Sequence, residues 1–215
     1  MDKFSVIIPT IWKSEYTLEL LNRYLNSEFV GEILLINNRE TETPQIPTNE
    51  KLKVITPVKN IYVNPAWNMG VREAKYPNIT ISNDDILFDV DEYYQYLEQT
   101  ENLLELGYIG AHSDNYNLEQ SKDVKIEVYD NRNNKGGWGC LFSFKKNLWK
   151  DIPDSLKIWY GDNFIHSQPN MIFQLRGIAT QTKMSTSSDL DEVREVRDND
   201  TKEWIKLINN YDRRN

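Results

Sequence analysis

The chain has 215 residues, a length that fits one domain, and its formal net charge of −8 argues against binding to the phosphate backbone of nucleic acids. The sequence contains no apolar run near the ~20 residues of a membrane span. Its single cysteine, Cys140, excludes an intrachain disulfide and suits a reducing compartment, so we expect a cytoplasmic protein.

The first part of the chain alternates between predicted strands and helices. Short apolar runs rich in β-branched residues predict strands over residues 4–9, 32–37, 53–56 and 79–82. Leucines at helical spacing predict a helix over 13–25, and Asn64 as N-cap with Pro65 in the first turn predicts another over 64–74. This alternation indicates an α/β fold with a mostly parallel central sheet flanked by helices.

The second part of the chain has weaker periodicity. We expect a helix over 90–106, strands over 108–111 and 140–144, an edge strand over 124–129, a loop over 136–139, an apolar stretch over 172–178 and a terminal helix over 204–211. The tail from residue 185 is polar and charged.

Polar clusters follow three of the predicted strands: Pro9-Thr10, Asn37-Asn38 and Asn83-Asp84-Asp85. In open α/β sheets, ligands bind at the carboxyl ends of the strands. The paired carboxylates of Asp84 and Asp85 are suited to Mg²⁺ or Mn²⁺, a cation that would neutralise a diphosphate leaving group. The alternative is an ordinary acidic turn.

Four segments resemble, in their order and spacing, the family-2-like GT-A glycosyltransferases. They are residues 4–10, an apolar strand closed by Pro-Thr; 64–85, an Asn-x-Gly helix before the strand that carries an Asp-x-Asp motif; 137–144, the acceptor-side segment; and 159–162, the later acidic motif. The resemblance implies a single GT-A catalytic domain over 1–215. Its nucleotide-sugar-binding half is expected at about 1–110, its acceptor-side half at about 111–184, and a tail and helix at 185–215.

The same resemblance assigns the donor site. Pro9, Thr10 and Trp12 are expected at the nucleotide base or ribose, and Asn68 near the diphosphate or base. Asn38, or its neighbour Asn37, stands where the family usually has an aspartate that contacts uracil. This departure leaves the identity of the base open, because an amide both donates and accepts.

The metal site is implied by the position of the Asp-x-Asp motif. Asp85 is the better metal ligand, whereas Asp84 is expected to contact ribose or sugar, and Asn83 departs from the motif. His166 is a candidate for a further ligand, as in some relatives; the alternative is a buried or surface histidine without a metal.

Asp162 is the candidate general base for an inverting transfer, since a carboxylate must take the proton from the acceptor hydroxyl. Its alternative is a turn residue after Gly161. Trp138 is expected either to stack on a sugar or to belong to the core. The basic residues considered for phosphate contact, against an ordinary solvated position, are Arg72, Lys75, Arg176 and Lys183.

The sequence therefore predicts a metal-dependent hexosyl or deoxyhexosyl transferase that uses a nucleoside diphosphate sugar, most simply a UDP-sugar, and a glycan or glycoprotein acceptor. Two alternatives remain: a non-catalytic nucleotide-sugar-binding domain, and a nucleotidyltransferase, although residues 9–13 lack the glycine-rich phosphate loop expected of the latter. The compact, Asn-rich chain is also similar to the N-terminal glycosyltransferase domain of chlorovirus capsid-glycan enzymes. That similarity would place the protein in the host cytoplasm.

Overall fold

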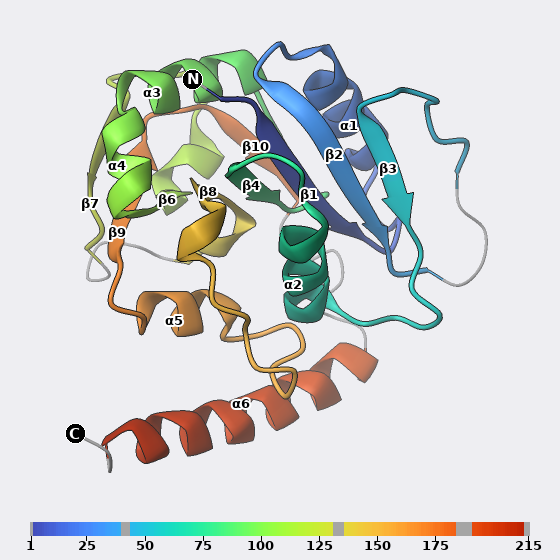
Figure 1. The fold of residues 1–215 in the computed structure, drawn as a ribbon, viewed down its shortest axis with the longest axis vertical. Helices are drawn as coiled ribbons and strands as arrows, with labels where there is room; N and C mark the ends of the chain where they lie inside the picture. Colours follow the sequence, from blue (N-terminus) through green and yellow to red (C-terminus); the bar gives the residue numbers. More distant parts are fainter. Residues whose placement is uncertain (1, 40–43, 131–135, 184–190, 213–215) are drawn as a thin grey trace.

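The computed structural model describes residues 2–39, 44–130, 136–183 and 191–212, and its centre is an eight-stranded sheet in the order β3-β2-β1-β4-β8-β6-β9-β7 (Figure 1). The strands of this sheet are β1 (Phe4–Thr10), β2 (Val30–Asn37), β3 (Leu52–Ile55), β4 (Asn78–Ser82), β6 (Gly107–Ala111), β7 (Lys125–Val128), β8 (Leu141–Lys145) and β9 (Met171–Arg176). The helices are α1 (Thr17–Asn26), α2 (Val63–Glu73), α3 (Val90–Gln99), α4 (Glu101–Leu106), α5 (Gly161–His166) and α6 (Asp191–Asp212), with 3-10 turns at Ser113–Asn117, Trp138–Cys140 and Lys146–Leu148. A separate antiparallel pair joins β5 (Ile86–Phe88) to β10 (Thr180–Thr182).

Strand direction confirms the predicted α/β fold with a mostly parallel sheet. β3, β2, β1 and β4 run parallel to one another, and β6 runs parallel to β9. β8 is antiparallel to both β4 and β6, and β7 is antiparallel to β9 at the edge. The register pairs Thr10 with Asn37 and Ile7 with Ile81, so the polar ends of β1, β2 and β4 reach the same edge.

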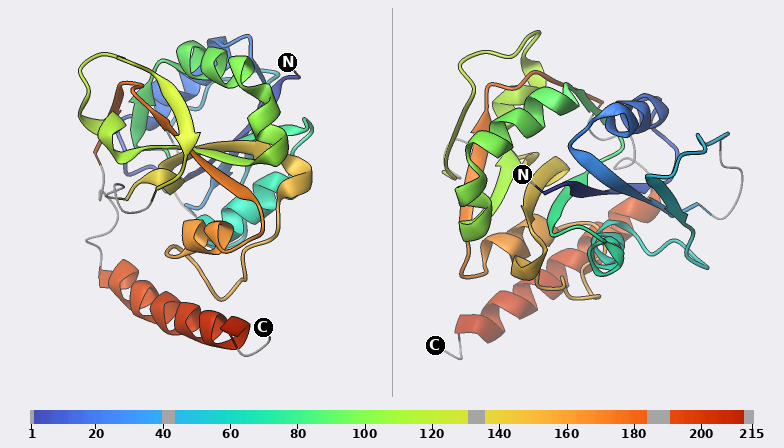
Figure 2. Two further views of the ribbon diagram at one scale, coloured as in Figure 1. Left: turned by 90° about the vertical axis from the view of Figure 1, so that its left-hand side faces the viewer. Right: turned by 45° about the horizontal axis from the view of Figure 1, so that its top comes forward.

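Helices cover both faces of the sheet, as the two views of Figure 2 show. Because side chains alternate along a strand, Val6 and Ile8 of β1 pack with α1 and α3 on one face, whereas Ile7 packs with α2 on the other. The second face also receives Ile165 of α5, and Trp204 of α6 packs against its edge. None of the helices in the described part of the chain combines the length and apolar character needed to cross a membrane.

Three predicted helices differ from those observed. The helix expected over 13–25 begins only at Thr17. The helix expected over 90–106 is divided at Thr100, whose hydroxyl donates to the carbonyl of Tyr96 (2.9 Å) and which has a non-helical φ of −125°. The terminal helix expected over 204–211 extends over Asp191–Asp212, because its first half is so charged that the apolar spacing is hidden.

Gly70 allows α2 to pack closely on β1. A Cβ atom at this position would lie 2.4 Å from Cγ2 of Ile7, a buried β-branched side chain with little freedom to move. We expect Gly70→Ala to lower the free energy of unfolding by about 1–2 kcal/mol, since overpacking outweighs the gain in helix propensity. Urea unfolding measures the change. Glu73→Ala, an exposed position of the same helix, should leave the midpoint near wild type, and a more stable Gly70→Ala would contradict the packing.

Candidate active site

A cleft of about 320 Å³ lies at the carboxyl edge of the parallel strands. Its walls come from the ends of β1 and β2, the start of α2 and the residues before it, the turn after β4, residues 158–162 and the first turn of α6, together with Gly137, Gly139 and Cys140. The predicted site residues that line it are Pro9, Thr10, Asn38, Asp84, Asp85 and Asp162. The structure thus brings together residues that span most of the chain.

The carboxyl group of Asp84 is half-buried and lies against two hydroxyl groups. Oγ1 of Thr10 donates to Oδ2 of Asp84 (2.5 Å), and Oγ1 of Thr17 lies 3.3 Å from the same oxygen. Burial raises the pKa of Asp84 to about 6, an effect that the neighbouring charge of Asp85 adds to and the two hydroxyl donors oppose. These bonds tie the turn after β4 to the end of β1 and the start of α1.

Asp85 and Asp162 line the cleft from elements far apart in the sequence. Both charges act on Cys140, whose pKa is raised to about 12 chiefly by burial, then by Asp85 and by Asp162. The Cys140 thiol is therefore protonated and is not a nucleophile. Asp162 packs against Gly139, where an added Cβ atom would lie 3.3 Å from the Cβ of Asp162.

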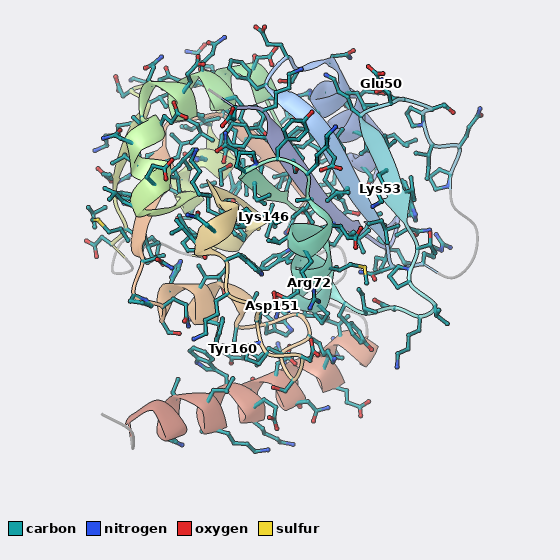
Figure 3. All side chains as sticks on the ribbon, viewed as in Figure 1. Glu50, Lys53, Arg72, Lys146, Asp151 and Tyr160 are labelled. Atoms are coloured by element: carbon teal, nitrogen blue, oxygen red, sulfur yellow. The ribbon has the colours of Figure 1, made fainter. Side chains whose placement is uncertain are left out.

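Among the described residues that line the cleft, some side chains are acidic and none is basic. The basic residues considered for phosphate contact have partners elsewhere: Arg72 with Asp151 (Figure 3), Arg176 with Asp114 and Glu127, Lys183 with Glu15, and Lys75 over the ring of Tyr76. An anionic ligand in this cleft would therefore need a cation to balance the charge.

A cation site made of protein ligands alone is absent from the described residues, since no three His, Cys, Asp or Glu side chains gather in a suitable group. Mg²⁺ and similar ions usually take one or two carboxylates and complete their coordination with substrate phosphates and water. Asp85, which lines the cleft, fits this second arrangement.

Two predicted donor-site residues lie beside the cleft instead of lining it. Oδ1 of Asn37 accepts from Nε1 of Trp12 (2.9 Å), and its Nδ2 donates to Oγ1 of Thr56 (3.2 Å). Trp12 has a positive φ of 59°, and its amide donates to the Thr10 hydroxyl (2.9 Å). These contacts link the residues that follow β1 to the end of β2 and stabilise the end of β1.

Asn68 and Trp138 are buried in the body of the protein. The amide of Asn68 makes two hydrogen bonds with the backbone of Ile152, donating to its carbonyl (2.8 Å) and accepting from its N–H (2.9 Å). Trp138 stacks on Phe142 with ring centroids 5.0 Å apart, and its Nε1 donates to the carbonyl of Phe173 (2.9 Å). Neither is among the residues that line the cleft.

His166 packs between aromatic rings one turn after Asp162 in α5. Its ring lies 4.5 Å from Trp138 and 4.6 Å from Tyr129, centroid to centroid. Burial lowers the pKa of His166, and the charge of Asp162 opposes this shift. The structure keeps this imidazole out of the cleft lining, next to the carboxylate that does line it.

Several residues that line the cleft were not predicted from the sequence. Tyr62 and Tyr160 both line the cleft with positive φ values of 67° and 65°, a conformation that a tyrosine rarely adopts and that nothing in the sequence signals. Strained backbone of this kind concentrates at functional sites. Val193, in the first turn of α6, also lines the cleft.

Asn64 has a different role from the one its sequence context suggests. α2 begins one residue earlier than predicted, with Tyr62 as N-cap, so the Asn64 side chain does not cap the helix. Its Nδ2 instead donates to the carbonyls of Leu156 (3.3 Å) and Trp159 (3.2 Å), across to the segment that leads into α5. The sequence suggests Asn64 as the N-cap because Pro65 follows it, but in the structure Pro65 is the third residue of α2.

The half-buried Asp84 carboxyl predicts a pH-dependent stability. Its pKa of about 6 in the folded state exceeds the unfolded value, so its stabilising contribution is complete below about pH 4 and is lost as the pH rises through about 6. We expect Asp84→Asn to raise the free energy of unfolding by about 1–3 kcal/mol at pH 8. The gain should shrink towards pH 4.

Denaturant unfolding at pH 4.5 and pH 8, with a chelator present, measures this difference. Asp154→Asn is the control, because Asp154 is exposed and lies outside the cleft. An Asp84→Asn variant less stable than wild type at pH 8 would contradict the burial of this charge.

Solved structures of other proteins share the fold. No protein-family model matches the sequence, and no curated protein matches it. S. aureus TarS 1–349 in complex with UDP-GlcNAc is similar over 90% of this chain and 64% of its own, with 17% identity and a TM-score of 0.60. GalNAc-T7 with UDP, GalNAc and Mn²⁺ is similar over 84% of this chain and 43% of its own, with 15% identity and a TM-score of 0.57.

HddC from Yersinia pseudotuberculosis is similar over 91% of this chain and 97% of its own, at 12% identity and a TM-score of 0.57. Against the TarS 1–349 structures, this chain spans only 59–64% of their length. At such low identities the similarity establishes the fold alone. The chain has the GT-A fold, a mixed α/β architecture with a mostly parallel central sheet, found in glycosyltransferases such as TarS and GalNAc-T7.

Proposed function

We propose that this protein transfers a sugar from a nucleoside diphosphate donor to an acceptor hydroxyl. The observation that carries the proposal is a cleft at the carboxyl edge of a GT-A sheet, whose lining includes Asp85, beside Asp84, and Asp162 from a later part of the chain. Donor binding requires an oxygen-ligated cation, and acceptor activation requires a base. One cleft with both carboxylates is suited to the two tasks together.

In this proposal the nucleoside binds against the ends of β1 and β2, between Pro9, Thr10 and Tyr62. Asn38 shapes this wall, since its Nδ2 donates to the carbonyl of Tyr62 (3.2 Å) and its Oδ1 accepts from the N–H of Ile61 (3.2 Å). UDP is the first nucleotide to test, because TarS has been solved with UDP and with UDP-GlcNAc. Trp12 and Asn37 do not line the cleft, but their hydrogen bond joins the ends of β1 and β2 that form this wall.

Asp85 is the proposed metal ligand, with the diphosphate oxygens completing the coordination of Mn²⁺ or Mg²⁺. The cation would act as a Lewis acid that neutralises charge on the leaving diphosphate. The acidic lining makes such a cation necessary, because no described Lys or Arg side chain is there to take its place. GalNAc-T7 has been solved with Mn²⁺. Among the described lining residues, the lack of basic side chains also weighs against nucleotidyl transfer.

Asp162 is the proposed general base for a transfer with inversion. Its Oδ1 accepts from the N–H of Asn163 (2.9 Å), and its Oδ2 is directed towards Gly139. The carboxylate takes the proton of an acceptor hydroxyl while that oxygen bonds to the anomeric carbon and the nucleoside diphosphate leaves with the bonding electron pair. A glycan or glycoprotein hydroxyl is the proposed acceptor.

Nucleotide binding is predicted to depend on the cation. In a thermal-shift panel of nucleoside diphosphates, we expect UDP with Mn²⁺ to raise the melting temperature, and UDP with a chelator to leave it unchanged, because the acidic cleft repels the free diphosphate. Asp85→Ala should lose the Mn²⁺-dependent shift, whereas Asp154→Ala should retain it. A panel in which no nucleotide stabilises the wild type, even with Mn²⁺, would contradict the donor site.

Removal of the proposed base should separate binding from turnover. We expect Asp162→Asn to keep the Mn²⁺-dependent thermal shift with UDP and to lose about 10²- to 10⁴-fold in kcat, the usual contribution of a positioned base. Release of UDP from a UDP-sugar in the presence of mono- and oligosaccharide acceptors measures kcat. Turnover equal to that of Asp154→Asn would rule out Asp162 as the base.

A further inference from the structure

The segment over residues 156–160 precedes α5, and its residues 158–160 line the cleft. This segment is held between two helices. On one side, the backbone N–H of Asn64 in α2 donates to the carbonyl of Lys157 (2.9 Å), and its side chain donates to two further carbonyls, as described above. On the other side, the carboxylate of Asp200 in α6 accepts from the backbone N–H groups of the same segment. The carbonyls therefore face one helix and the amides face the other.

Asp200 makes three hydrogen bonds to consecutive amides. Its Oδ1 accepts from the N–H of Lys157 (2.9 Å), and its Oδ2 accepts from the N–H groups of Ile158 (2.8 Å) and Trp159 (2.9 Å). The Asp200 side chain is fully buried. A buried carboxylate is costly unless its oxygens are satisfied, and charge-assisted bonds of this kind are stronger than neutral ones.

Two further contacts of α6 hold Tyr160, the last residue of this segment. The ring of Tyr160 stacks on that of Trp204 at 5.8 Å and 10° between planes, and its hydroxyl lies 3.0 Å from Oγ1 of Thr201 (Figure 3 shows Tyr160 above α6). Tyr160 has the positive φ of 65° that turns the chain into α5, and Asp162 is the second residue of that helix. The orientation of α5 thus depends on residues held by α6.

We propose that Asp200 is a positioning residue, which holds residues 157–159 so that Asp162 points into the cleft. The inference rests on the proposed function for its effect on turnover, but the contact itself is independent of any substrate. Asp200 touches neither the donor nor the acceptor in this arrangement, because it acts through the backbone of the segment and is absent from the cleft lining.

Asp200→Asn tests this role with little change in shape, because it replaces one of the two acceptor oxygens with a donor that faces an amide. We expect kcat to fall by roughly 10- to 100-fold, the cost of a small misplacement of a reacting group, while the KM for the donor sugar stays within about twofold of wild type. Hydrogen exchange at the amides of 157–159 should become faster. The matched control is Asp198→Asn, an exposed aspartate of the same helix.

Several outcomes would overturn the inference: amide exchange at 157–159 equal to that of Asp198→Asn, a kcat equal to that of the control despite faster exchange, or a loss of kcat accompanied by faster exchange throughout the chain. If Asp200→Asn does not fold, Thr201→Val takes its place, with the same readouts and a smaller expected loss. This variant removes the hydroxyl contact with Tyr160 and the hydrogen bond to the carbonyl of Arg197 (2.8 Å) within α6. A wild type that transfers no sugar would contradict the proposed function, and unchanged exchange would still overturn the Asp200 contact separately.

Discussion

The parallel pairing of β1 with both β2 and β4 determines where every other feature of the site lies. The register aligns Thr10 with Asn37 and brings the turn after β4 to the same edge, so polar residues that follow three separate strands share one wall. The bond from Thr10 to Asp84 then fixes that turn against β1. Asp85, the next residue, lines the cleft beside Asp84.

This half of the molecule could be predicted from the sequence, because its signals are local. Strand ends are visible as apolar runs followed by polar residues, and parallel strands place those ends together. The different roles expected of Asp84 (contact with ribose or sugar) and Asp85 (metal ligand) came from a family resemblance. The structure gives Asp84 a contact that the resemblance did not suggest. Its carboxyl group binds the hydroxyls of Thr10 and Thr17, which lie far away in sequence.

The other wall of the cleft depends on contacts that carry no local signal. Asn68 had the sequence context of a ligand residue, yet its amide is used by the backbone of Ile152, and Trp138 fills the core beside Phe142. Asp200 lies in a stretch where charged residues predominate, so the sequence does not distinguish it from the exposed aspartates nearby. Only the folded chain shows that this carboxylate satisfies three amides of a segment that lines the cleft.

The acidity of the cleft couples the binding of the cation to the binding of the diphosphate in the proposed reaction. With Asp85 and Asp162 in the lining and no described basic side chain beside them, neither a free cation nor a free diphosphate finds a complete site. Each supplies what the other lacks: the cation screens the carboxylates, and the phosphate oxygens complete its coordination. Binding of the two must then be coupled reciprocally, since linkage requires the same factor in both directions. A negatively charged protein can in this way be selective for nucleotides that arrive with their metal and exclude those that do not.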